Sequence, residues 1–273
     1  MSEPLLRVEG LVVEYPGGRR RPGLRANDDV SIEIAPGETL GLVGESGSGK
    51  STLGDAILGF APVTAGRIWF KGEDIVQADP KRRRQLTRLI QPIFQNPFGS
   101  LNPARTIGAT LREGPLAHGL VSPGEADQKV AQWLDIVGLP PATARRYPRD
   151  FSGGQRQRVA IARALIMEPE LVICDEAVSA LDLSIQAQVL NLLSDLKRRV
   201  GLSYLFISHD MAVVEHMSDR VVVLHQGRVV EQGPVDEVVN HPSQPYTRSL
   251  LSAVPLPDPI AQRARRAARK ETP

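Results

Sequence analysis

The feature that most constrains this 273-residue chain is a glycine-rich segment, GESGSGKST, over residues 44–52. An apolar run over 39–43 precedes it, and residues 51–58, with apolar positions at helical spacing, follow it. A strand, such a loop and a helix in this order are the setting of the phosphate-binding pattern G-x-x-x-x-G-K-[ST]. A pattern of this length arises by chance in about 1% of chains of this size. The segment therefore predicts an α/β domain that binds a nucleoside triphosphate.

Each part of this phosphate loop (44–52) has a physical task. Glycines let the backbone curl so that successive amides point at an anion, and the following helix adds the positive end of its dipole. Lys50 supplies a cation for the β- and γ-phosphates, and the Ser51 hydroxyl is a candidate magnesium ligand. The candidate nucleotide contacts are Gly44, Glu45, Ser46, Gly47, Ser48, Gly49, Lys50, Ser51 and Thr52.

A second apolar run, LVICDE over 171–176, ends in two carboxylates. Asp175, at the end of a buried strand, is a candidate magnesium ligand. Glu176 is a candidate general base that polarises an attacking water. Carboxylates often end strands by chance, so the pair alone is a weak signal. After a phosphate loop it becomes a strong one.

The segment FSGGQRQR over 151–158 has two interpretations. In one, Ser152 is the N-cap of a helix and the two glycines form a turn. In the other, the same helix amino terminus, with its small residues, lets a phosphate approach closely. Residue chemistry alone favours neither.

Composition and charge exclude several classes of protein. With 41% apolar and 23% charged residues, the chain is too apolar to be disordered. The single cysteine, Cys174, excludes an intramolecular disulfide and a multi-cysteine metal site. We find no membrane span or signal peptide, and expect a soluble, cytosolic chain. The net charge is +2, and residues 258–273 carry five basic against two acidic side chains, so the rest is nearly neutral, which argues against a nucleic-acid binder.

Strand-like and helix-like segments alternate along the chain, which predicts a parallel α/β sheet. Residues 126–137 have helical spacing, within a stretch of little strand character over 106–149, and predict a small helical insertion. Gln226–Gly227 joins two short apolar runs and predicts a hairpin. The predicted strands are 5–15, 30–34, 39–43, 66–70, 171–174, 203–207, 221–224 and 228–231.

The order of five motifs resembles the ATPase subunit of an ABC transporter. The motifs are the phosphate loop, FSGGQRQR, LVICDE, SALD over 179–182 and ISHD over 207–210, and they cover nearly the whole chain. The resemblance implies an α/β fold with a RecA-like P-loop NTPase core, an antiparallel β subdomain and a helical subdomain that carries the signature motif. It also implies ATP and Mg²⁺ as cofactors.

The family implies roles for further residues. Gln95 matches the glutamine that links magnesium to the membrane-domain contact, and His209 matches the histidine on the γ-phosphate. Asp182 falls in the loop that communicates across the dimer. Tyr15 stands where the family stacks an aromatic on adenine. Taken alone, His209 has an alternative interpretation as an ordinary strand-end histidine, and Tyr15 has one as a half-buried core aromatic. The signature loop, which acts on ATP held by a partner subunit, is Phe151, Ser152, Gly153, Gly154 and Gln155.

The resemblance also sets the expected domain organisation. Residues 1–255 form the ATPase domain, with a helical subdomain over about 96–165 and a family-type extension over about 234–255. Residues 256–273 form a basic tail that we expect to be flexible. Two positions depart from the family pattern: Phe151 replaces a common leucine, and Ala177 stands where many relatives have proline.

Further segments narrow the family to the dipeptide and oligopeptide importers, a branch that includes glutathione and nickel importers. The similar segments are 93–108, 175–196, 201–221 and 241–255. The resemblance implies ATP-driven import of peptides through two separate permease subunits. The other implied partners are a second, different ABC ATPase and an extracytoplasmic substrate-binding protein, with no nucleic acid. The implied location is the cytoplasmic face of the inner membrane. The alternatives are a nickel importer and a soluble ABC ATPase of phosphonate breakdown.

Overall fold

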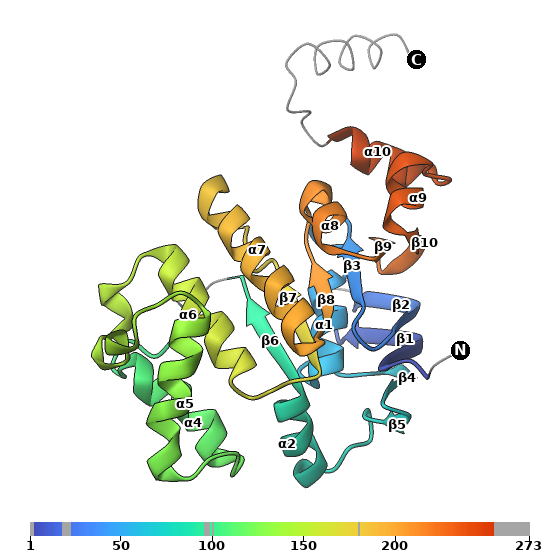
Figure 1. Cartoon of the computed structure of the whole chain (residues 1–273). Coiled ribbons are helices and arrows are strands. Elements are labelled where there is room, and N and C mark those ends of the chain that lie inside the picture. Colours follow the sequence, from blue (N-terminus) through green and yellow to red (C-terminus); the bar gives the residue numbers. More distant parts are fainter. Residues whose placement is uncertain (1–2, 18–22, 96–98, 100, 180, 254–273) are drawn as a thin grey trace.

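The computed structural model describes residues 3–17, 23–95, 99, 101–179 and 181–253. The basic tail expected over 256–273 lies outside this part of the chain. The described residues form two β-sheets surrounded by helices (Figure 1). Among these residues, no helix is both long and apolar enough to cross a membrane.

The larger sheet has six strands in the described part of the chain, in the order β10-β9-β3-β8-β7-β6. Its central strands pair in parallel, and β10 pairs antiparallel with β9. The central strands are almost wholly buried, as expected for a parallel sheet with both faces covered. The bounds are β3 Thr39–Val43, β6 Ile90–Phe94, β7 Leu171–Asp175, β8 Ser203–Ile207, β9 Arg220–His225 and β10 Arg228–Pro234.

The smaller sheet is antiparallel, with the order β2-β1-β4-β5. Buried residues alternate with exposed ones along much of β1 and β2, because one face packs on the core and the other meets solvent. The strands are β1 Leu6–Tyr15, β2 Leu24–Ile34, β4 Ala65–Phe70 and β5 Glu73–Asp74.

The helices divide into three groups in space. Helices α4, α5 and α6 lie together beyond β6, on one side of the molecule, while α9 and α10 lie near β9 and β10 at the other (Figure 1). The rest surround the six-stranded sheet. The bounds are α1 Lys50–Leu58, α2 Pro80–Leu89, α4 Ile107–Ala117, α5 Pro123–Ile136, α6 Gly153–Leu165, α7 Leu183–Val200, α8 Met211–Met217, α9 Val235–Asn240 and α10 Pro245–Ala253, with 3-10 turns at Pro141–Arg145 and Pro148–Asp150.

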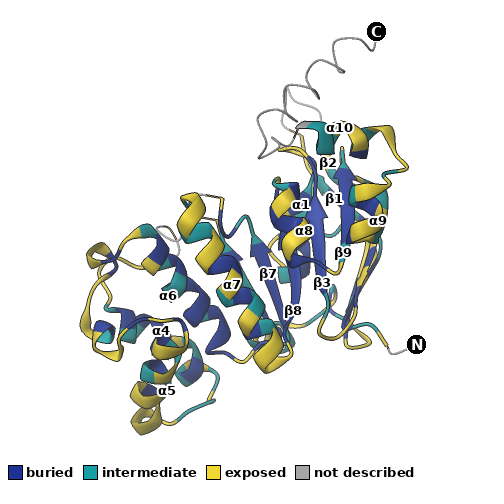
Figure 2. Cartoon of the chain, turned by 45° about the horizontal axis from the view of Figure 1, so that its top comes forward, coloured by how far each residue is buried: buried dark blue, intermediate teal, exposed yellow. Residues whose placement is uncertain are grey.

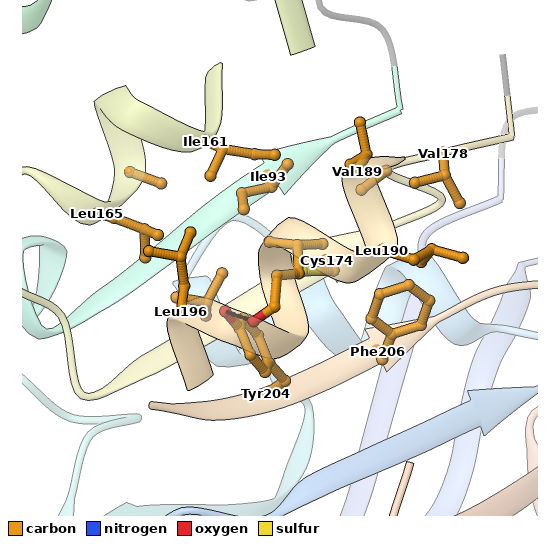
Figure 3. Close-up of a cluster of buried hydrophobic side chains, with 14 of the residues drawn as sticks. Ile93, Ile161, Leu165, Cys174, Val178, Val189, Leu190, Leu196, Tyr204 and Phe206 are labelled. Atoms are coloured by element: carbon orange, nitrogen blue, oxygen red, sulfur yellow. Dashed lines mark hydrogen bonds between the residues drawn. The ribbon is translucent and has the colours of Figure 1, made fainter. Parts of the chain in front are cut away.

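The buried residues follow the large sheet and the inner faces of its helices (Figure 2). Side chains of α6 and α7 pack over Cys174 and Phe206 on the neighbouring strands β7 and β8 (Figure 3). Tyr204 is fully buried there, and its hydroxyl donates to the Leu193 carbonyl at 3.2 Å. Burial raises the pKa of the Cys174 thiol far above its usual value, so this cysteine is an inert core residue.

Candidate nucleotide site

The candidate site residues lie at one edge of the six-stranded sheet. The parallel strands β3, β8, β7 and β6 are neighbours, so their carboxyl ends meet at this edge. The phosphate loop follows β3, His209 follows β8, and Gln95 follows β6. Asp175 ends β7, and Glu176 comes directly after it. Ligands of parallel α/β sheets commonly bind at this edge.

The phosphate loop requires glycine at two positions because other parts of the chain press against its backbone. Gly44 and Gly49 have positive φ angles of 153° and 100°. A Cβ atom at Gly44 would lie 2.1 Å from the Leu224 carbonyl oxygen, and one at Gly49 would lie 2.2 Å from that of Ala26. Strands β9 and β2 therefore support the loop from outside, and a side chain at either glycine would push the loop away from them.

Lys50 folds back onto the loop in this structure. Its ammonium donates to the carbonyl oxygens of Gly44 and Glu45, each at 2.8 Å. The residue is 5% exposed, and burial lowers the pKa of its ammonium, although the nearby carboxylates of Glu176 and Asp175 oppose this shift. The side chain is thus a desolvated cation held inside the curl of the loop.

Ser51 and Asp175, two of the predicted magnesium ligands, are in direct contact. The Ser51 hydroxyl donates to Asp175 Oδ1 at 3.1 Å, across a separation of 124 residues. Burial, with the charges of Glu176 and Asp55, raises the pKa of the Asp175 carboxyl, and the Ser51 hydrogen bond opposes that shift. A cation beside Asp175 would favour its ionised form.

Glu176 and His209 form a direct pair. His209 Nδ1 lies 3.1 Å from Glu176 Oε1. The Glu176 backbone has φ of 47°, a left-handed conformation that is unfavourable for a non-glycine residue. Its N–H donates to the Ile207 carbonyl at 3.0 Å, so the end of β8 fixes this turn. The structure therefore brings the candidate base and the candidate histidine together.

Gln95 is connected to Glu176 through the hydroxyl of Ser179. Its amide donates to the Ser179 hydroxyl at 3.2 Å, and this hydroxyl donates to the Glu176 carbonyl at 3.0 Å. Ser179 was not among the predicted site residues; its place in SALD, next to Asp182, was the available signal.

A cavity of about 410 Å³ opens beside the phosphate loop. Tyr15 lies on its wall and is 37% exposed, so it is not a core aromatic. Sequence analysis predicted the hairpin turn at Gln226–Gly227 but missed its place in this cavity, and it missed Arg25 altogether. The remaining lining residues are Leu24, Ala26, Ser46, Gly47, Gly49, Lys50, Ser51, Thr52 and Glu176.

The signature segment lies elsewhere, at the start of α6. Ser152 is the N-cap, as the structural interpretation of FSGGQRQR predicts, and its side chain and that of Gln155 form a reciprocal capping box. The two glycines of that interpretation, Gly153 and Gly154, are the first residues of the helix rather than a turn before it. A Cβ at Gly154 would lie 2.4 Å from Ile185 on α7, so glycine is needed for this helix contact. Asp182 caps α7 in turn, and its bond from the Ile185 amide helps to lower the pKa of its carboxyl.

Comparison with known proteins agrees with this geometry. A family model described as ABC transporter matches residues 27–179, more than half of the chain. The chain belongs to the ABC transporter family. As an ABC ATPase it binds and hydrolyses ATP. A second model, the C-terminal region of oligopeptide/dipeptide transporters, matches residues 230–273 of this ATPase.

Several curated relatives resemble this ABC ATPase over nearly all its length. A putative peptide import ATP-binding protein of Brucella ovis is 50% identical over 270 residues, which cover 99% of this chain and 84% of the relative. The glutathione import ATP-binding protein GsiA of Escherichia coli O157:H7 is 51% identical over 273 residues, 97% of this chain but 43% of that longer protein.

Solved structures share the predicted ABC fold. CbiO1 from Clostridium perfringens, part of the ABC transporter complex cbiONQ, has a TM-score of 0.78 at 28% identity and covers 96% of this chain and 99% of its own. The ATP-binding cassette MJ0796, in a dimeric post-hydrolysis state with ADP and Pi, has a TM-score of 0.75 at 27% identity, covering 84% of this chain and 98% of its own.

Proposed function

We propose that this ABC ATPase drives the import of peptides through separate permease subunits. The match of residues 230–273 to the C-terminal region of oligopeptide/dipeptide transporters carries the proposal, because this region lies outside the ATPase motifs shared by the wider family. The names of the relatives, peptide import and glutathione import, support it. Glutathione is itself a peptide, so both names indicate one class of cargo.

Mg-ATP is the proposed substrate form. The structure offers Mg²⁺ the Ser51 hydroxyl and the Asp175 carboxylate, 3.1 Å apart, with Gln95 at the end of the neighbouring strand β6. The described residues contain no group of three or more His, Cys, Asp or Glu side chains able to hold a metal. Oxygen ligands in small number suit Mg²⁺, which takes its other ligands from phosphates and water. The ion would neutralise charge on the β- and γ-phosphates.

The proposed chemistry uses the pair at the end of β7 and β8. Glu176 lines the cavity, and its carboxylate would accept a proton from the attacking water. His209, 3.1 Å from that carboxylate, would orient it and contact the γ-phosphate. Lys50 would exchange its two backbone carbonyl partners for phosphate oxygens, and Tyr15 would stack on adenine at the cavity wall.

A second ABC ATPase subunit is the proposed source of the missing half of the site. The phosphate loop of this chain lines the cavity, but no described residue of the signature segment 151–155 does so. We propose that these residues, with Asp182, act on ATP bound to a different ABC ATPase in a heterodimer, which in turn supplies a signature segment here.

The helical subdomain, proposed over 96–165, gives the permeases a place to dock. A second cavity, of about 350 Å³, lies between the α2–β6 segment and helices α4 and α6. Polar side chains dominate its wall, among them Gln91, Arg105 and Glu113. We propose that a cytoplasmic segment of one of the two permeases docks here while the other permease docks on the partner ATPase, which holds the ATPase on the cytoplasmic face of the inner membrane.

The test is reconstitution. The chain, its partner ATPase, the permeases and the extracytoplasmic binding protein are placed in vesicles, and uptake of a labelled dipeptide, a longer peptide, glutathione and Ni²⁺ is compared. We expect ATP-dependent uptake of at least one peptide, abolished by Glu176→Gln. Uptake of Ni²⁺ alone would overturn the assignment of peptides as the cargo. ATP hydrolysis without association with any permease would favour a soluble ATPase.

A further inference from the structure

The carboxy-terminal extension touches the phosphate loop directly. Helix α10 begins at Pro245, and the hydroxyl of its Tyr246 accepts a hydrogen bond from the backbone N–H of Glu45 at 3.2 Å. The two residues are 201 positions apart. Glu45 is the second residue of the phosphate loop, and its carbonyl oxygen is one of the two that hold Lys50. The residue is thus held from both sides: Tyr246 holds its N–H, and Lys50 holds its carbonyl.

The same tyrosine supports the loop at a second point, through the hairpin of β9 and β10. Its ring stacks on that of His225, with centroids 3.9 Å apart and planes 13° from parallel. His225 ends β9 and leads into the turn at Gln226–Gly227. The N–H of Gly227 donates to the Ser48 carbonyl at 3.0 Å, in the middle of the phosphate loop.

Helix α10 is fixed well enough to serve as a support. Its start is tied to β10 because the Glu231 carboxylate accepts from the Ser243 N–H at 2.7 Å, the Ser243 hydroxyl at 2.8 Å and the Gln244 N–H at 3.2 Å. Although burial works against the ion, the bonds from Ser243 and Gln244 help to hold the pKa of Glu231 below its usual value. Glu231 therefore stays ionised at neutral pH, and α10 stays attached to the sheet that carries His225.

We propose that Tyr246 is a positioning residue of the nucleotide site, through which the extension holds the phosphate loop in its binding geometry and raises the affinity for ATP. A phosphate loop binds best when its amides already point inward, since loop ordering then costs less on binding. Without the Tyr246 hydroxyl, the Glu45 N–H would lose its hydrogen-bond partner, and the Glu45 carbonyl would in turn lose Lys50 once the ammonium turns to the phosphates. This inference rests on ATP binding by the loop and adds a residue from outside the ATPase motifs.

The test compares Tyr246→Phe with the wild-type full-length chain. The variant removes one hydroxyl and keeps the ring. We expect the Kd for ATP, measured by displacement of a fluorescent ATP analogue, to rise about threefold, within the range for one neutral hydrogen bond. We also expect faster hydrogen exchange at the Glu45 amide, measured by NMR on the isotope-labelled protein.

Tyr204→Phe is the matched control. It also deletes one tyrosine hydroxyl bond, from Tyr204 to the Leu193 carbonyl, but at the amino-terminal end of β8, away from the phosphate loop. It should lower the stability and leave the Kd for ATP unchanged. His225→Leu, which removes the stacking partner, should weaken ATP binding in the same direction. The double variant with Tyr246→Phe should be weaker than wild type by less than the product of the two single effects.

The outcomes distinguish a failure of the positioning role of Tyr246 from a failure of the nucleotide site itself. An unchanged Kd in Tyr246→Phe overturns the positioning role, whether or not exchange at Glu45 becomes faster. Equal rises in Kd for Tyr246→Phe and Tyr204→Phe overturn it too, because stability alone would then explain the loss. A wild-type chain that bound no ATP would refute the nucleotide site itself, and the role of Tyr246 with it.

Discussion

The phosphate loop and the signature segment differ in what their own chain supplies. Around the loop, β2, the β9–β10 turn, Lys50 and Tyr246 fix the backbone from several sides. The signature segment 151–155 has a capped helix start packed against α7, and it lies outside the nucleotide cavity. The difference supports the proposal that affinity for ATP belongs to one chain, whereas hydrolysis needs a second. The predictions below test this division.

The largest effect is expected at Glu176. Glu176→Gln should leave the Kd for ATP within about twofold and reduce the turnover number at least about a hundredfold, because a positioned base is lost while the phosphate contacts remain. Turnover is measured with the assembled transporter, and binding with the chain alone. A loss of affinity as large as that of Lys50→Ala would contradict the assignment of Glu176 as base.

Lys50→Ala and Ser152→Arg should divide affinity from hydrolysis. Lys50→Ala removes a charge from the phosphates and should raise the Kd of the isolated chain about tenfold or more, the range for a charged hydrogen bond. Ser152→Arg should leave that Kd unchanged and still abolish turnover in the assembly. The reason is that the ATP on which Ser152 is proposed to act is bound to the partner ATPase. Full steady turnover by a strictly monomeric preparation would contradict the proposal that hydrolysis needs a second ATPase subunit.

A smaller effect on the affinity for ATP is expected at Tyr15. Tyr15→Ala should weaken ATP binding by about 1–3 kcal/mol if adenine stacks on the ring. Tyr15→Phe and Tyr15→Trp should be nearly neutral, because both keep a flat aromatic face. A Trp variant that binds as poorly as the Ala variant would show that stacking is the wrong explanation.

The smallest effect is expected at Phe151, which replaces the common leucine. Phe151 is 4% exposed, and the Arg146 guanidinium lies 5.0 Å from the centre of its ring. Phe151→Leu should lower the free energy of unfolding by about 0.5–1 kcal/mol through the lost cation–π contact. ATP binding by the isolated chain should not change. Denaturant unfolding checks the stability, and nucleotide titration checks the ATP binding. A changed Kd for ATP would contradict the expectation that the signature segment does not affect ATP affinity in the isolated chain.

The fold was predictable from the sequence where patterns were strong. Strands β3 and β8 have the predicted bounds because they are buried apolar runs, and α1 begins one residue earlier than predicted. Strand β6 was missed because IQPIF contains Pro92, which is compatible with β6 as the edge strand of its sheet. Strand β2 begins at Leu24 rather than Val30, since polar residues and Asp29, with φ of 59°, obscure the alternation.

The candidate site was predictable in its parts more than in its contacts. The motif residues come from four strand ends, and their meeting follows from the parallel order of the sheet. Sequence alone contains no signal for Arg25 on the cavity wall, or for the bond between Tyr246 and Glu45, because these depend on how distant segments pack. Hydrophobic periodicity predicts local helices and strands, but it does not predict which residues far apart in the sequence come into contact.

The backbone of Glu176 has a consequence for selection. Its left-handed φ of 47° costs about 1 kcal/mol or more, a strain that glycine does not carry. Glu176→Gly would relieve the strain and remove the carboxylate in one step. On the proposed role of Glu176 as the general base, a screen that ranks variants of this protein by melting temperature alone would therefore favour chains that no longer hydrolyse ATP.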